Sequence, residues 1–402
     1  MAKRYGCPYQ GSKNAIAEDV IAFLPKGERL VDLFGGGGAI THCALESRKY
    51  SIVLYNELDK LVFDYVRKAF TGGYKTEKRW ISREDFNDLK NSDGYVRYCW
   101  SFGNSGRYYL YSSEIEPWKR ALHFARVFDY TAFLSDFGIT SDGSIQDVKK
   151  NKDEYKEKYI RWYLKEVLKS DADFDVLRKT VQTDLKLQKE ELRSYLCDAL
   201  QKSGLKQSDI NKALNTQMAS HWFVRSQWQF PTREQYAALS GLIPLKPYDE
   251  VYGYSYLLQS LESLERLQSL ERLQSLERLQ SLESLERLQS LERLEYSNAS
   301  YETYRHEAGD VVYCDIPYEG TRGYSAPFDH AAFYDWAASR GFPVFVSSYN
   351  IGDARFFPVW EKEKSVLFNQ KGSDGKKMER IYVQAKYADE FRARKTQLDL
   401  FP

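Results

Sequence analysis

The chain has 402 residues, of which 43% are hydrophobic and 15% aromatic, so it can fold into two or three globular domains rather than a disordered chain. Its net charge is only +1, so any nucleic-acid binding must come from local patches. The five cysteines form no CxxC pair and the five histidines have no ligand spacing with them, which argues against a metal site or a disulfide framework. The chain shows no signal-peptide core and no run of 18 apolar residues, so we expect a cytoplasmic protein without membrane association.

The first 75 residues predict alternating helices and strands. A helix is expected through "NAIAEDVIAFLP" (14–25), and strands are expected at "ERLVDLF" (28–34) and "YSIVLYNE" (50–57), with a Gly-rich turn and a second helix between the strands. Such alternation is typical of a parallel sheet covered by helices, so the fold class is expected to be α/β.

The turn in "LVDLFGGGGAITHCAL" (30–45) suits a nucleotide cofactor. Asp32 ends the strand, and glycines then let the backbone approach a ligand at the start of a helix. The lysine of a phosphate-binding loop is absent, which favours contact with the ribose and amino-acid end of a cofactor over phosphate binding. Glu57, at the next strand end, could accept hydrogen bonds from ribose hydroxyls. A tight structural turn and a solvated strand-end acid are the alternatives.

Two segments of the middle region could contact DNA. Residues 99–112, "CWSFGNSGRYYLYS", combine aromatics, glycines and Arg107 in an expected loop, for which a purely structural role is the alternative. From about 144 to 240 the pattern is helical and charged, and residues 196–242 resemble the helix-turn-helix of phage-repressor-like regulators, with Ser208 as an N-cap. An ordinary helical bundle is the alternative. A later helix there should bear Met218 and most of the candidate DNA contacts, which are Gln217, Ser220, His221 and Arg225.

Residues 258–294 repeat the hexapeptide "LERLQS", with leucine at every third position. On an α-helix this spacing drifts around all faces, because 3.6 residues make one turn. Leu, Glu, Arg and Gln nevertheless favour a helix, so a long helix is expected, with a stacked solenoid as the alternative. Length variation or self-association is the role we expect for this repeat.

After residue 295 the alternation of strands and helices returns. Strands are expected at "DVVYCDI" (310–316), "FPVFVSSYN" (342–350) and "RIYVQAK" (380–386). The first of them runs into Asp315, Ile316, Pro317 and Tyr318. Asp and Pro often build turns after strands, so a structural turn is one interpretation of this tetrapeptide.

The last residues, "KTQLDLFP", place apolar side chains on a polar tail. They resemble the short peptide by which bacterial replication and repair proteins dock on the sliding clamp. The resemblance implies that Gln397, Leu398, Leu400 and Phe401 bind the clamp. The alternative is that these side chains fold back on the preceding domain.

Five motifs, taken in order, resemble the Dam-like (α-group) DNA adenine-N6 methyltransferases of bacteria and phages: "PYQGSK", "VDLFGGGG", "YNELD", "SNASYETY" and "CDIPY". The resemblance covers about residues 5–70 and 295–385. It implies a Rossmann-like methyltransferase sheet that uses S-adenosylmethionine to methylate double-stranded DNA. The residues it assigns to the cofactor are Tyr9, Lys13, Asp32, Phe34, Gly36, Gly38, Asn56, Glu57, Ser300 and Tyr301.

The resemblance also implies roles for the tetrapeptide. Asp315 and the Ile316 carbonyl would accept hydrogens of an adenine amine, which aims the nitrogen lone pair at the methyl group. Pro317 belongs to the same motif, and Tyr318 would stack on the adenine flipped out of the duplex. The family usually has Pro where this chain has Ile316, which leaves the contributing carbonyl in place.

The expected organisation is therefore a split methyltransferase domain with a mainly helical DNA-recognition insertion. Its parts are 1–75 and 296–390 for the methyltransferase halves, 76–254 for the insertion, 255–295 for the repeat and 391–402 for the tail. One alternative is a methyltransferase acting on RNA or on protein glutamine, although such enzymes commonly begin the tetrapeptide with Asn. Another is a DNA-bound regulator with weak catalysis, for which Ile316 leaves some room.

Overall fold

The computed structural model describes residues 4–140, 144–169, 190–225, 228–229, 231–248, 251, 272–285, 291–319, 328–365 and 376–392. Contacts divide the chain into two units, one made of Met1–Leu110 with Gln274–Pro402 and the other of Tyr111–Leu273. The contact-based boundaries differ from the sequence-based ones, because residues 76–110 and 274–295 belong to the first unit. The tail residues Gln397, Leu398, Leu400 and Phe401 lie outside the described residues.

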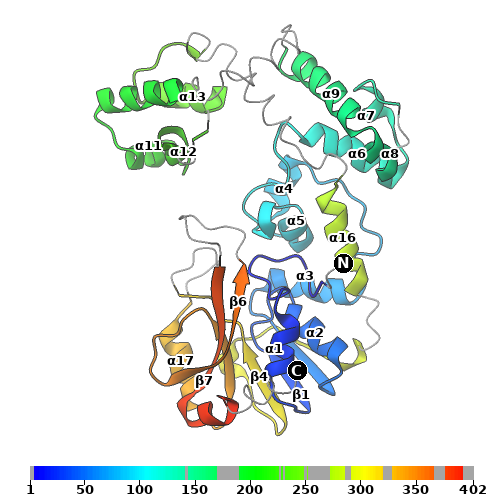
Figure 1. Ribbon diagram of the computed structural model, residues 1–402, viewed down its shortest axis with the longest axis vertical. Coiled ribbons are helices and arrows are strands. Elements are labelled where there is room, and N and C mark those ends of the chain that lie inside the picture. Colours follow the sequence, from blue (N-terminus) through cyan, green and yellow to red (C-terminus); the bar gives the residue numbers. More distant parts are fainter. Residues whose placement is uncertain are drawn as a thin grey trace. The chain divides into compact units, whose positions relative to one another are not determined.

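The first unit contains a seven-stranded mixed sheet with the order β3-β2-β1-β4-β5-β7-β6 (Figure 1). Neighbouring strands from β3 to β5 pair in parallel, whereas β7 runs antiparallel to both β5 and β6. The sheet confirms the expected α/β class. The strands are β1 Arg29–Asp32, β2 Ile52–Asn56, β3 Leu294–Ser297, β4 Asp310–Cys314, β5 Val344–Ser348, β6 Phe356–Ser365 and β7 Lys376–Gln384.

Five of these strands were predicted from sequence, and two were not. β3 starts at the last leucine of the repeat, so the leucine period hides its beginning. β6 carries Pro358 and alternating charges, and its register shifts between Pro358 and Trp360. Proline, charge and a bulge are typical of an edge strand, which is the position of β6 in the sheet.

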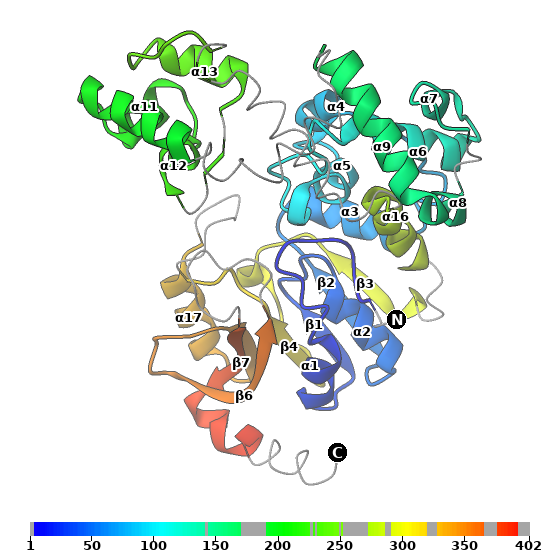
Figure 2. The same cartoon turned by 45° about the horizontal axis from the view of Figure 1, so that its top comes forward.

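Helices cover both faces of the sheet (Figures 1 and 2). α17 packs Phe333 and Ala337 against Val344 and Val346 of β5 in one buried cluster. α1 lies on the opposite face, where Phe23 meets Phe345 edge-on at 6.5 Å between ring centroids. The helices of this unit are α1 Ala17–Phe23, α2 Ala39–Ser47, α3 Lys60–Phe70, α4 Arg83–Leu89, α5 Gly94–Cys99, α16 Gln274–Leu285 and α17 His330–Ser339, and the short 3-10 turns are η1 Phe102–Asn104, η4 Leu291–Arg293, η5 Tyr301–Thr303 and η6 Ala385–Tyr387.

Part of the leucine repeat forms α16, which confirms the helix prediction for these twelve residues. Leu279, Leu282 and Leu285 are buried. The Arg278 guanidinium donates hydrogen bonds to the carbonyls of Cys99 (2.7 Å) and of Ser101 (2.9 Å). These contacts tie the described part of the repeat to the first unit beside α5.

The described part of the second unit consists of helices, as predicted for most of residues 144–240. One helical group includes Trp118, which packs on Tyr159 at 5.6 Å. A second group has its own buried cluster, which includes Leu196, Ile210 and Trp222. The helices are α6 Glu116–Phe128, α7 Ala132–Ser135, α8 Ile145–Lys150, α9 Lys152–Trp162, the π-helical turn η2 Tyr163–Val167, α11 Gln207–Ala213, α12 Ala219–Phe223 and α13 Arg233–Ser240.

Within the described ranges, no helix combines the length and the apolar character that crossing a bilayer requires.

Candidate active site

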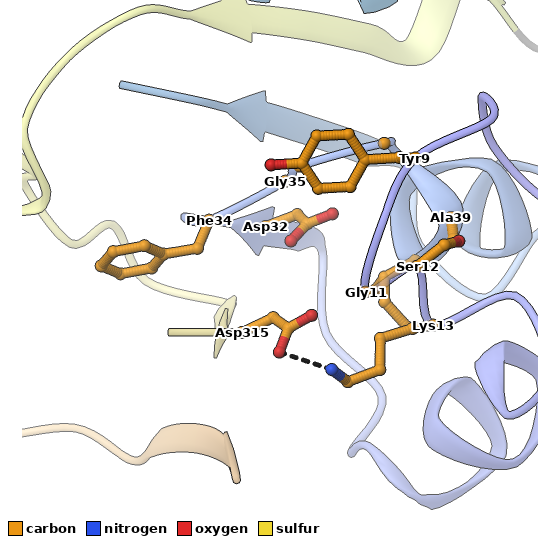
Figure 3. A pocket seen from close by; sticks show the side chains of 12 residues that line it. Tyr9, Gly11, Ser12, Lys13, Asp32, Phe34, Gly35, Ala39 and Asp315 are labelled. Atoms are coloured by element: carbon orange, nitrogen blue, oxygen red, sulfur yellow. Dashed lines mark hydrogen bonds and ion pairs between the residues drawn. The ribbon is translucent and has the colours of Figure 1, made fainter. Parts of the chain in front are cut away.

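The candidate site lies at the carboxyl ends of β1 and β4, which are neighbours in the sheet. The chain continues from β1 to β2 on one side of this pair, and from β4 to β5 on the other. Open α/β sheets bind ligands at such a switch point. A hollow of about 290 Å³, which includes the open space at its mouth, is found there (Figure 3). It is lined by Tyr9, Gly11, Ser12, Lys13, Asp32, Phe34, Gly35, Gly36, Gly37, Ala39, Ile40 and Asp315.

The glycine turn is shaped by close backbone approach. A Cβ atom on Gly37 would lie 2.6 Å from the Cβ of Tyr9 and 3.0 Å from the carbonyl oxygen of Cys7. The Cys7 N–H also donates to the Gly37 carbonyl at 2.7 Å. Gly38 has a φ of 72°, a backbone conformation that other residues rarely adopt, and it is the N-cap of α2. Glycine at position 37 therefore allows the segment with Cys7 and Tyr9 to pack directly against the turn.

Asp32 supplies a buried carboxylate to this hollow. Its side chain is 1% exposed, and its Oδ2 accepts a hydrogen bond of 2.8 Å from the Thr41 hydroxyl. Burial raises the pKa of Asp32 to about 7; the Thr41 hydrogen bond opposes this rise, and the nearby negative charge of Asp315 adds to it. A bound cation would stabilise the ionised form of this buried carboxylate.

Glu57 and Asn56 follow β2 and are engaged by the backbone. The two oxygens of Glu57 accept hydrogen bonds of 2.9 Å from the N–H groups of Gly36 and Asp59. Burial raises the pKa of Glu57, whereas these backbone hydrogen bonds lower it. The Asn56 amide donates to the carbonyls of Leu33 (2.9 Å) and Ala299 (3.0 Å). Glu57 retains acceptor capacity because each carboxylate oxygen has two lone pairs. The Asn56 amide instead connects the segments that follow β1 and β3.

Aromatic rings form two sides of the region. The Tyr9 ring lies 5.1 Å from that of Tyr98, and the Phe34 ring lies 5.7 Å from that of Tyr301. Ser300 caps η5 by accepting from the Glu302 N–H at 3.3 Å. Of the predicted cofactor residues, the structure brings Tyr9, Lys13, Asp32, Phe34 and Gly36 to the hollow together with Asp315, whereas Gly38, Asn56, Glu57, Ser300 and Tyr301 do not line it.

Asp315 belongs to a polar network. Its Oδ1 accepts from the Lys13 ammonium at 2.6 Å, and the same ammonium lies 3.8 Å from Oε1 of Glu379 (the Asp315 contact is drawn in Figure 3). The Tyr318 hydroxyl contacts both Lys13 and Glu379, and the Ser347 hydroxyl donates to Oε1 of Glu379 at 2.9 Å. Lys13 is 4% exposed and Glu379 is 0% exposed, so these charges are held away from bulk water.

The remaining residues of the tetrapeptide are fixed by packing. Ile316 is 1% exposed and belongs to the buried cluster under α17. The Pro317 carbonyl accepts from Nε2 of His330 at 2.6 Å. The Tyr318 ring meets that of Tyr349 edge-on at 4.5 Å. Ile316 therefore has an apolar place of its own in the core.

Glu379 and Ser347 were missed from sequence. Glu379 shares the buried face of β7 with Ile381 and Val383, because residues two apart in a strand point to the same side. A charged residue in phase with buried apolar ones was the available signal. The predicted strand began at Arg380, one residue after Glu379, so the alternation that includes Glu379 was not recognised.

The helix-turn-helix prediction requires corrections. α11 begins at Gln207, so Ser208 is inside the helix; Asp209 instead accepts from the Lys206 N–H at 2.8 Å. α12 spans only Ala219–Phe223, so it carries Ser220 and His221, whereas Met218 is its N-cap and Gln217 and Arg225 lie outside it. The helix ends at Phe223, because Val224 is extended and the carbonyls of His221 and Trp222 accept from the Gln229 N–H (2.7 Å) and from the Trp228 Nε1–H (2.9 Å). Arg225 is 79% exposed and faces Glu190 at 3.5 Å.

The segment 99–112 forms a closed turn. The Phe102 N–H donates to the Tyr108 carbonyl at 2.8 Å, and the Leu110 N–H donates to the Trp100 carbonyl at 2.9 Å. Phe102 is 53% exposed, Tyr108 is 70% exposed, and Arg107 between them is also exposed. The turn therefore presents two aromatic rings and one cation to solvent.

Comparisons with known proteins give no match, either among protein-family models or among curated proteins. Within the described residues, no group of three His, Cys, Asp or Glu side chains is arranged to hold a metal ion.

Proposed function

We propose that the protein is a DNA adenine-N6 methyltransferase that uses S-adenosylmethionine. The observation that carries this proposal is the position of the Asp315-Ile316-Pro317-Tyr318 motif, at the end of β4 and beside the glycine turn after β1. A cofactor bound at the turn would lie next to the carboxylate of Asp315. The ordered motifs of the sequence and the switch point of the sheet lead to the same site.

The residues present suit this cofactor. The backbone of the glycine turn lines the hollow at Gly35, Gly36 and Gly37, so a ligand there could meet main-chain groups. Tyr9 and Phe34 offer apolar surface, while the buried Asp32 offers negative charge to the cationic cofactor. S-adenosylmethionine would supply an activated methyl group, which passes to the adenine amine nitrogen as its bond to sulfur breaks.

The chain's own residues would prepare the amine. The nitrogen lone pair is delocalised into the adenine ring, so the amine is a poor nucleophile. Asp315 and the Ile316 carbonyl would accept its two hydrogens, which localises the lone pair on nitrogen. After transfer the nitrogen loses one proton, and Asp315 is positioned to receive it. Tyr318 would hold the flipped base by stacking.

Recognition of DNA is proposed for the second unit and the turn around Arg107. His221 and Ser220 on α12, with Gln217 and Arg225 flanking it, remain the candidate contacts. The exposed rings of Phe102 and Tyr108 add a surface on which bases could stack. Docking of the tail on a sliding clamp remains a proposal from sequence.

The test is methyl transfer to an unmodified DNA duplex, measured with radiolabelled S-adenosylmethionine. We expect incorporation at adenine by the wild type, and a loss of at least about 1,000-fold in Asp315→Ala with cofactor affinity nearly unchanged, because Asp315 acts on the amine. Asp335→Ala, which removes an exposed carboxylate of α17, is the matched control and should retain activity.

Each alternative substrate has its own outcome in this assay. Incorporation into RNA or into a glutamine-containing peptide, but not into DNA, would overturn the assignment to DNA. DNA binding without incorporation into any of the three would favour the regulator.

A further inference from the structure

One ammonium group, that of Lys13, lies near two carboxylates in the candidate site. The Lys13 Nζ lies 2.6 Å from Asp315 Oδ1 and 3.8 Å from Glu379 Oε1. If both acids are ionised, one positive charge faces two negative charges; Lys13 and Glu379 are buried, and Asp315 is 21% exposed. A displacement of the ammonium by about 1 Å would exchange the hydrogen-bonded partner, because an N–H···O bond needs about 2.9 Å.

Glu379 is built into the sheet as an acceptor. It lies on β7, opposite Lys362 of β6, and its side chain is 0% exposed. Its Oε1 accepts from the Ser347 hydroxyl at 2.9 Å and contacts the Tyr318 hydroxyl. Among the described residues, its Oε2 has no hydrogen-bond partner. A buried carboxylate oxygen without a donor is costly, so the site has capacity for one more N–H or O–H group.

The proposed reaction needs Asp315 without its hydrogen bond to the Lys13 ammonium. A carboxylate that already holds an ammonium at 2.6 Å is a poorer acceptor for the amine hydrogens of adenine. The amine nitrogen also gains positive charge as it is methylated, and an ammonium on the same carboxylate would repel it. Lys13 must therefore release Asp315, and its charge needs another partner nearby.

We propose that Glu379 is a positioning residue that takes over the Lys13 ammonium when the target amine enters, leaving Asp315 to accept the amine hydrogens. The inference rests on the proposed methyltransferase function. The Tyr318 hydroxyl contacts both Lys13 and Glu379. Stacking of the base on the Tyr318 ring would therefore be coupled to the position of the Lys13 ammonium.

The experiment compares Glu379→Gln with the wild type on a DNA duplex. Glutamine keeps the size and an acceptor oxygen for Ser347 and Tyr318, so the fold should persist. We expect kcat to fall by about tenfold or more, because Lys13 stays on Asp315 during the transition state. The KM for DNA, and the Kd for S-adenosylmethionine measured by calorimetry, should stay within about threefold of wild type, since the change acts on the reacting amine. Glu361→Gln on the neighbouring strand removes an exposed charge and should leave kcat unchanged.

A double-mutant cycle with Lys13→Gln tests the coupling, at saturating cofactor. Without Lys13 there is no ammonium to withdraw, so Glu379→Gln should have almost no further effect on kcat. If kcat of the double variant falls by the combined losses of the two single variants, the proposal is overturned. A wild-type kcat in Glu379→Gln would also overturn it. A wild-type protein that transfers no methyl group to DNA would instead overturn the proposed function itself, and this result is obtained before any variant is compared.

Discussion

Asp32 is a carboxylate whose charge depends on what occupies the site. An unfolded chain would ionise it near pH 3.9, whereas burial raises its pKa to about 7 in the folded protein. Between these values the folded state binds more protons than the unfolded state, so the free energy of unfolding falls as pH rises. A cation bound beside Asp32 would remove this cost by lowering the pKa again.

We predict that S-adenosylmethionine affinity rises with pH. A cationic ligand favours ionised Asp32, so the affinity should increase by up to about tenfold per pH unit as the pH approaches 7 from below, and then level off. Calorimetric titrations from pH 5.5 to 8.5 would measure this. Asp32→Asn should bind more weakly at pH 8 and show a flatter pH dependence. Asp335→Asn is the control with wild-type behaviour, and an equally steep curve in Asp32→Asn would contradict the prediction.

At the scale of elements, the turn between β1 and α2 depends on backbone contacts with the N-terminal segment. Gly37 sits against Tyr9 and Cys7, and the Cys7 N–H donates to the Gly37 carbonyl. The segment that carries Tyr9 and Lys13 is thus held against the turn. Any side chain at this contact separates the two parts of the proposed cofactor site.

Gly37→Ala should therefore weaken cofactor binding and destabilise the fold. Its Cβ would lie 2.6 Å from Tyr9 Cβ, and such overpacking typically costs about 1–3 kcal/mol of the free energy of unfolding. Denaturant unfolding and calorimetric titration would measure both effects. Gly341→Ala adds the same methyl group where nothing lies within 4 Å, and it should be nearly neutral. Unchanged cofactor affinity in Gly37→Ala would show that the turn does not form the site.

The elements around α12 allow a separate prediction for DNA. Arg225 is 79% exposed beyond the helix end, so a phosphate contact suits it, whereas His221 lies on α12. Arg225→Ala should weaken binding of all duplexes alike and reduce the salt slope by about 1. His221→Ala should relax sequence choice by about 1–3 kcal/mol at one base pair. Duplex titrations at several salt concentrations would separate the two effects, and unchanged binding in both variants would move base reading to residues 99–112.

Sequence patterns were informative where the chain is locally regular. Strands such as β1 and β4 have buried apolar runs, and residues that follow both of them line the hollow. The role of Glu379 was missed because its partners, Lys13 and Ser347, are distant in sequence, and Ser347 meets it only through the pairing of β5 with β7. α12 ends early because residues later in the chain, Trp228 and Gln229, donate to the carbonyls of Trp222 and His221, which a local pattern does not reveal.

At the scale of the whole molecule, the chain forms two units with separate buried clusters. Units with separate cores often unfold in separate steps, so a single two-state transition is not expected. A ligand stabilises only the unit that binds it. The proposed cofactor residues all belong to the unit that holds the sheet.

Differential scanning calorimetry should thus show more than one transition. At a concentration 100 times its Kd, S-adenosylmethionine should stabilise one transition by about 2.7 kcal/mol and leave the other in place. Asp335→Ala should show the same shift, whereas Gly37→Ala should show a smaller one. A single transition that moves as a whole on adding the cofactor would mean that the two units unfold together.

The pairing of β1 with β4 also has a consequence for synthesis on the ribosome. Roughly 280 residues separate the two strands in the chain, although they are neighbours in the sheet. At about 5–20 residues per second, β4 would emerge on the order of 15–60 s after β1. During this interval the apolar β1 has one unpaired edge, which is a template for aggregation. Cells that translate quickly, or that supply chaperones to the nascent chain, should yield more native protein.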